Sequence, residues 1–154
     1  MIRTQEGAEQ TSLTSIKLLE QRFGLKLPES YQQFLLTTNG GRPERDLILV
    51  PGCAASSYAR IHFFFGVDDA VESCDLAWNI ALRSDLPSGA IPIATTEGAD
   101  IFCLTPKGGV LFWDGYENKP YPLADDFDGF LVQLYRDEHS PAFSSEETNQ
   151  DRHE

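Results

Sequence analysis

Three short apolar runs lie close together in the middle of the chain. They occupy residues 91–94, 101–104 and 110–113, and the turn-rich residues 105–109 join the last two runs. Runs of about four apolar residues fit strands better than helices, and a five-residue connection that contains glycine fits a β-hairpin. The sequence therefore predicts that strands paired with their chain neighbours form the centre of the fold.

Two helices are predicted before these strands. The first carries apolar residues at helical spacing from Leu13 to Phe23 and stops at Gly24. The second has Pro28 in its first turn and ends before Asn-Gly-Gly at residues 39–41, which adopt left-handed backbone readily. Both helices therefore have sequence signals for their starts or ends.

The rest of the chain predicts a mixed domain. Residues 47–50 and 61–67 are strand-like, and the second run, with three consecutive Phe, suits the centre of a sheet. Asp68 is predicted to cap a third helix, residues 114–122 a polar loop, and Asp126 to cap a final helix. The third helix has an apolar stripe of Val71, Cys74, Trp78 and Leu82. The fold class is α+β, with N-terminal, central and C-terminal helices covering a largely antiparallel mixed sheet.

The length of 154 residues fits a single domain. We expect a flexible N-terminus at residues 1–10, a folded domain over 11–137 and an acidic, mobile tail over 138–154. The N-terminus lacks an apolar signal segment and no run is long enough to span a membrane, which favours a cytoplasmic protein. Three isolated cysteines argue against a disulfide framework.

The net charge of −12 indicates which class of partner the protein can bind. Residues 95–154 hold 13 acids against four Lys or Arg, so most of the excess lies in the second half of the chain. Such a surface repels phosphate backbones and anionic lipids, so direct binding of nucleic acid or membranes is not expected. A protein with a basic surface is the favoured partner.

The sequence contains no catalytic motif. Cys53 and His62 form a conceivable nucleophile and base, but no local signature joins them. Residues 125–129 resemble a calcium loop without its full pattern, and the glycines fit no phosphate-binding motif. No cofactor, metal ion or catalytic residue is therefore predicted.

Acidic residues and nearby aromatic residues are the candidates for binding a partner. Carboxylates cluster in predicted loops and helix starts, where a solvated surface is the simpler interpretation for any single residue. Together they offer a negative patch with aromatic anchors for a cationic protein. The candidates are Asp68, Asp69, Glu97, Asp100, Trp113, Asp114, Tyr116, Glu117 and Tyr121.

A set of motifs in fixed order resembles the SUKH superfamily, which includes SMI/KNR-type regulators and bacterial immunity proteins. The L-P-x-x-Y-x-x-F-L segment starts at Leu27 and runs into N-G-G at 39–41, and an apolar strand ends at Phe65-Gly66. I-P-I-A follows at 91–94, and residues 108–114 match a G-x-V-x-F-W-D-like strand. The closing L-A-x-S-F-x-x-F-L pattern starts at Leu123, with Asp126 in place of its Ser. The resemblance covers residues 13 to 135.

This resemblance implies a binding module rather than an enzyme. The implied function is that of a bacterial immunity protein, which binds a cognate toxin with a basic, nuclease-like surface and inhibits it stoichiometrically. Two alternatives remain: a regulatory scaffold with several cellular partners, and an enzyme that uses His62 and nearby carboxylates. The sequence does not identify the toxin, the docking face or the oligomeric state.

Overall fold

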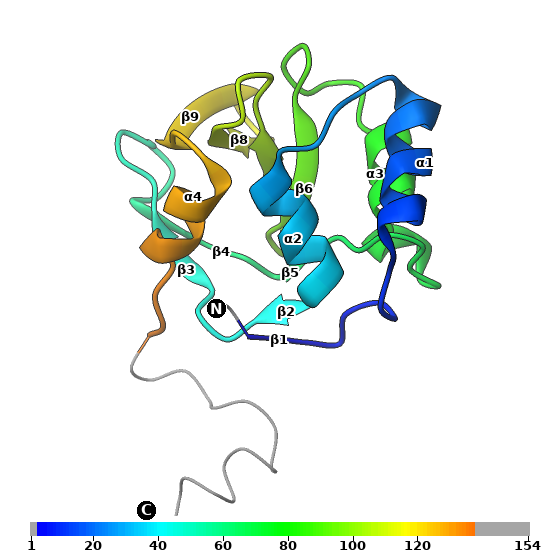
Figure 1. Ribbon diagram of the computed structural model, residues 1–154. Helices are drawn as coiled ribbons and strands as arrows, with labels where there is room; N and C mark the ends of the chain where they lie inside the picture. The colour runs from blue at the N-terminus through cyan, green and yellow to red at the C-terminus, as the bar shows by residue number, and fades with distance from the viewer. Residues whose placement is uncertain (1–2, 138–154) are drawn as a thin grey trace, which may run out of the picture.

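The computed structural model describes residues 3–137, and the tail predicted over 138–154 lies outside these residues. Four α-helices, one 3₁₀ helix and nine strands follow one another in this part of the chain (Figure 1). In order, they are β1 (Thr4–Gln5), α1 (Leu13–Phe23), α2 (Glu29–Thr37), β2 (Arg42–Pro43), β3 (Leu47–Leu49), β4 (Tyr58–Arg60), β5 (Phe63–Phe64), η1 (Glu72–Cys74), α3 (Leu76–Leu82), β6 (Ile91–Thr95), β7 (Ile101–Leu104), β8 (Val110–Asp114), β9 (Lys119–Ala124) and α4 (Phe127–Gln133). The α+β fold class is confirmed.

A five-stranded antiparallel sheet in the order β5-β6-β7-β8-β9 forms the centre of the fold. The predicted β7–β8 hairpin is confirmed, with Ile101 opposite Trp113 and Leu104 opposite Val110. The prediction of a loop over residues 114–122 is wrong in its second half. The chain turns within residues 115–118, and β9 then pairs with β8 because an edge strand tolerates the prolines of this segment.

The two faces of the sheet are covered differently. Side chains alternate along β7 and β8, as the pleat of a strand requires. Phe102, Leu104, Val110 and Phe112 join the main core with the helices, whereas Ile101, Cys103, Leu111 and Trp113 pack on the other face against Leu86 and Ala90. The chain between α3 and β6 therefore covers the second face.

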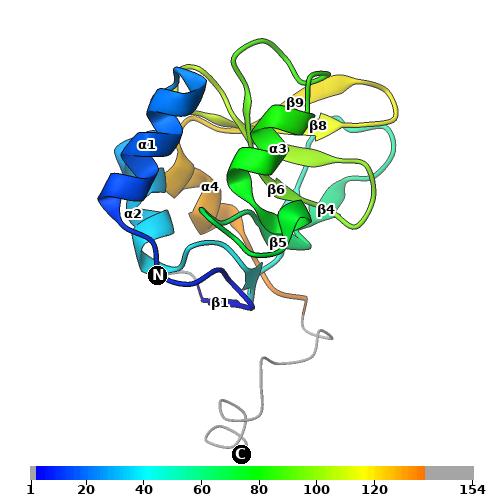
Figure 2. The same cartoon turned by 90° about the vertical axis from the view of Figure 1, so that its right-hand side faces the viewer.

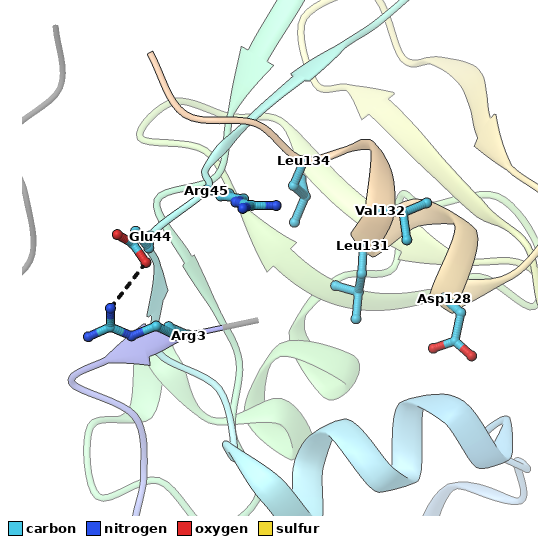
Figure 3. Close-up of a pocket in the computed structure, with 7 residues that line it drawn as sticks. All are labelled: Arg3, Glu44, Arg45, Asp128, Leu131, Val132 and Leu134. Carbon is cyan, nitrogen blue, oxygen red and sulfur yellow. Dashed lines mark ion pairs between the residues drawn. The ribbon is translucent and has the colours of Figure 1, made fainter. Parts of the chain in front are cut away.

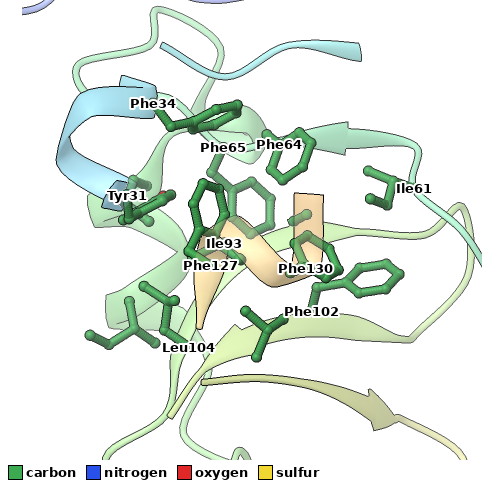
Figure 4. Packing of buried hydrophobic residues seen from close by; sticks show 14 of the residues in the cluster. Tyr31, Phe34, Ile61, Phe64, Phe65, Ile93, Phe102, Leu104, Phe127 and Phe130 are labelled. Atoms are coloured by element: carbon green, nitrogen blue, oxygen red, sulfur yellow. The ribbon is translucent and has the colours of Figure 1, made fainter. Parts of the chain in front are cut away.

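Aromatic side chains from α2 and α4 fill the main core against the sheet (Figure 4). The Phe34 ring lies 4.8 Å from the Phe64 ring, and the Phe102 ring lies 5.9 Å from the Phe130 ring, measured between centroids. The predicted cap of α4 is confirmed, since the Asp126 carboxylate accepts a hydrogen bond from the amide of Gly129.

The apolar run at residues 61–67 does not form one central strand, so that prediction is wrong. β4 ends at Arg60 and pairs with β3, whereas β5 contains two residues at the edge of the large sheet. The amide of Ile61 donates to Asp46, and the next amide, of His62, donates to Thr95. The chain thus passes from one sheet to the other within two residues.

The third helix begins later than predicted. Asp75, rather than Asp68, caps α3, and its carboxylate accepts hydrogen bonds from the amides of Trp78 and Asp69. Asp68 has a φ of 59° and lies in the turn before η1. Asp is a favoured N-cap residue at either position, but only Asp68 was predicted, and the contacts of Asp75 with Trp78 and Asp69 set the start of the helix there.

Asn39 joins three segments that are distant in sequence. Its amide nitrogen donates to the carbonyls of Glu9 and Val67, and its amide oxygen accepts from the Val67 amide. The predicted left-handed backbone at residues 39–41 is confirmed, with a φ of 44° at Asn39. Residues before α1 are thus held to the chain that follows β5, and β1, which the sequence did not predict, pairs with β2.

Candidate functional site

Two loops that carry predicted partner-binding residues lie at one end of the large sheet. Residues 96–100 join β6 to β7, and residues 115–118 join β8 to β9. Because Ile101 lies opposite Trp113 across the hairpin, both loops lie at the same end. We call Glu97, Tyr116 and Glu117, the exposed predicted residues of these loops, the turn group.

Two buried or partly buried carboxylates fix the backbone under the turn group. Asp100 accepts a hydrogen bond from the Gly115 amide at 2.9 Å, and Asp114 accepts from the amides of Tyr116 and Glu117 at 2.9 and 3.1 Å. The pKa of the Asp100 carboxyl is raised, mainly by burial and also by the charge of Asp114. The hydrogen bond from the Gly115 amide opposes this shift. These two carboxylates support the loops rather than face solvent.

Only part of the predicted set is available for direct contact. Tyr116 is 80% exposed, and Glu97 and Glu117 are exposed. In contrast, Trp113 is 7% and Asp114 2% exposed, and Tyr121 is also buried. Trp113 and Asp114 are consecutive and both buried because both faces of β8 are covered, and Tyr121 of β9 points into the main core. The polar sequence around these residues did not reveal this cover.

Asp68 and Asp69 lie at the other end of the large sheet. β5 runs antiparallel to β6, so the chain after Phe65 moves toward Ile91 and away from the turn group. Asp68 is exposed and borders a small groove with Leu18 and Ala77. The predicted patch is therefore two separate groups.

The structure also exposes apolar residues of the predicted third helix. Trp78 is 36% and Leu82 55% exposed on α3, whereas Leu76 and Asn79 of the same helix are buried. The signal in the sequence is that α3 contains no charged residue. Periodicity gives the spacing of these apolar residues but does not say which side of the helix is covered.

The conceivable catalytic pair is not assembled. His62 lies 4.0 Å from the Glu97 carboxylate and packs against the ring of Phe63. Among residues 3–137, no hydrogen bond or ion pair joins it to Cys53, which packs beside the main core. Nor do three His, Cys, Asp or Glu side chains gather anywhere in this range to hold a metal ion.

A surface groove of about 460 Å³ lies beside α4 (Figure 3). Its charged walls come from Arg3 and Glu44, joined by a 3.5 Å ion pair, and from Arg45 and Asp128. Leu131, Val132 and Leu134 supply the apolar wall. None of the predicted partner-binding residues lines this groove.

An antiparallel sheet with helices over one face and loop-borne carboxylates at its ends defines a class of small α+β domains. Within this class, the chain belongs to the SMI1 / KNR4 family (SUKH-1), whose model matches residues 10–133. Family membership confirms the resemblance drawn from the motifs.

A solved structure shares this fold. It is the crystal structure of a protein from Pseudomonas syringae pv. tomato, which is 18% identical, with a TM-score of 0.57 over 86% of this chain and 88% of that chain. None of the curated protein sequences matches the chain. In the part of the chain that the structure describes, no helix has the length and apolar character needed to cross a membrane.

Proposed function

We propose that this protein is a bacterial immunity protein that binds a cognate toxin in the cytoplasm and inhibits it stoichiometrically. The observation that carries the proposal is the net charge of −12 on a SUKH-family domain. A nuclease needs a basic surface to hold its phosphate substrate, so an acidic protein is complementary to it. The toxin is therefore expected to be basic and nuclease-like.

The turn group is suited to steering the encounter. Glu97, Tyr116 and Glu117 are all exposed, and Asp100 and Asp114 hold the backbone of their loops. Exposed charges of this kind raise association rates, toward about 10⁸ M⁻¹s⁻¹ at low salt, more than they slow dissociation. Glu97→Lys with Glu117→Lys should therefore reduce the association rate and its dependence on salt.

The first test is a tagged pull-down from the native cytoplasm, washed at low and high salt, with partners identified by mass spectrometry. The proposal expects one stoichiometric basic protein that survives the high-salt wash. Expression of that partner alone should then arrest growth, and co-expression of this protein should restore it. Several salt-labile housekeeping proteins would instead establish a regulatory scaffold, and growth arrest that co-expression does not relieve would refute inhibition.

The design uses Glu97 rather than Asp114 for charge reversal. The Asp114 side chain is 2% exposed and accepts two amide hydrogen bonds, so a Lys at this position would disrupt the β8–β9 turn itself. Glu97, in contrast, has an 80% exposed side chain with one long contact to His62. A reversal at Glu97 and Glu117 therefore tests binding without testing folding.

A further inference from the structure

The outer side of α3 is an apolar surface on a protein with a net charge of −12. Figure 2 shows α3 facing the viewer, with α1 beside it. Its outer side chains are Trp78, Ala81 and Leu82, and its two buried side chains are Leu76 and Asn79. A surface helix ordinarily presents polar residues to water, and a helix that lacks them is normally covered. We call Trp78, Ala81 and Leu82 the α3 face.

The apolar surface extends past the helix. Val71, just before η1, is 57% exposed, and Leu18 of α1 is 61% exposed. Leu18 and Ala77 line the same groove of about 150 Å³ between α1 and α3. A band of exposed apolar groups therefore crosses two helices, which is characteristic of a binding surface.

The charges around the α3 face are mostly negative. Asp68, Asp69, Glu72, Asp75 and Asp85 flank α3 in sequence. Two bases are also near: Arg83, which donates to the Asn79 side chain at 3.2 Å, and Arg22, which lies over the Phe23 ring at 4.9 Å. The acidic residues therefore outnumber the basic ones around this face. An apolar centre with an acidic rim is complementary to an apolar anchor with a basic rim.

We propose that the α3 face is the docking surface for a basic protein partner that inserts apolar side chains between its own Lys and Arg residues. This inference rests on the proposed function and assigns to α3 the contacts that hold the complex, while the turn group steers its formation. A second copy of the chain fits poorly, because symmetric pairing brings the two acidic rims together. Trp78, the aromatic residue of the α3 face, is 36% exposed and is the expected anchor.

The test uses a defined probe, a fluorescein-labelled 18-residue helical peptide with Leu on one side and Arg and Lys on the other. Fluorescence anisotropy measures its binding to the whole protein. Leu82→Ser and Trp78→Ala should each weaken binding at least tenfold, whereas Val132→Ser, at an 82% exposed position on α4, should change it less than twofold. Circular dichroism melts confirm that each variant is folded.

Two charge reversals of equal size separate local recognition from general attraction. The double variant Glu72→Lys with Asp85→Lys should lower the affinity for the peptide by a factor more than five times that of Glu97→Lys with Glu117→Lys. Both pairs change the net charge equally. Equal effects of the two pairs, or no effect of Leu82→Ser, would overturn the docking surface. Light scattering that shows a wild-type dimer converted to monomer by Leu82→Ser would also overturn it, because the occupant would then be a second copy.

The outcome is distinguishable from that of the toxin assay. If the pull-down yields a toxin whose dissociation rate is unchanged by Leu82→Ser, the α3 face is excluded while the immunity function stands. If no toxin is found but the peptide is sensitive to the α3 variants as expected, the docking surface stands and the immunity function fails.

Discussion

Replacement of Asn39 should be among the most damaging single changes in the protein. The side chain is 1% exposed and makes three hydrogen bonds, at 2.7 Å to Glu9, and at 3.1 and 2.8 Å to the carbonyl and amide of Val67. Its φ of 44° adds a second requirement, since left-handed backbone disfavours residues other than Gly and Asn. Asn39→Ala removes the bonds and strains the backbone at once.

The two effects have different expected sizes. Three net hydrogen bonds contribute about 3 kcal/mol to the unfolding free energy. Relaxation of the structure cannot recover much of this loss, because the Val67 amide stays buried without a partner. The left-handed backbone costs Ala about 1 kcal/mol more than Gly. We expect unfolding free energies lower by about 4 kcal/mol for Asn39→Ala and about 3 kcal/mol for Asn39→Gly.

Urea denaturation followed by far-UV circular dichroism measures these differences. Asn118 is the matched control, because its φ is 55°, it is exposed, and among the described residues its side chain makes no hydrogen bond. Asn118→Ala should therefore cost about 1 kcal/mol and Asn118→Gly nearly nothing. A loss for Asn39→Ala no larger than that for Asn118→Ala would refute the argument that the hydrogen bonds of Asn39 stabilise the fold.

Three further predictions concern stability. Tyr31→Phe should raise the unfolding free energy by about 1 kcal/mol, because the hydroxyl is buried with no partner among the described residues; a loss of similar size in urea denaturation would contradict this. Burial raises the pKa of the Cys103 thiol from 9.0 to about 12, so the unfolded thiol ionises first and stability should fall by up to about 1.4 kcal/mol per pH unit between those values. Cys103→Ala should flatten that decline, and an unchanged slope would disprove the assignment. Gly115→Ala should cost about 2 to 3 kcal/mol, because its Cβ would meet the Ala99 carbonyl oxygen at a distance that real contacts never show. Gly98→Ala, which meets nothing closer than 3.8 Å, should melt within a few degrees of the wild type by differential scanning calorimetry.

Local chemistry in the sequence determined the elements whose stabilising contacts lie within a few residues. Gly24 ends α1 with a φ of 64°, Asp126 caps α4, and residues 101–113 form a hairpin, each as the sequence predicted. In these cases the preferred backbone, the capping oxygen and the turn are supplied by the segment itself. The acidity that favours a basic partner is likewise a property of composition alone.

The tertiary structure decided which side of each apolar pattern is covered. The sequence favours Trp113 and Tyr121 as partner-binding anchors, yet both are buried, Trp113 under the chain between α3 and β6 and Tyr121 in the main core. Trp78 and Leu82 of the apolar stripe are instead exposed. Asp68 and Asp75 are both able to cap a helix, and contacts to Gly66 and Asp69 select Asp75. Burial depends on partners that are distant in sequence, and neither periodicity nor residue type contains that information. The sequence therefore determined the local elements and the charge, and tertiary packing alone determined the surface that is available to a partner.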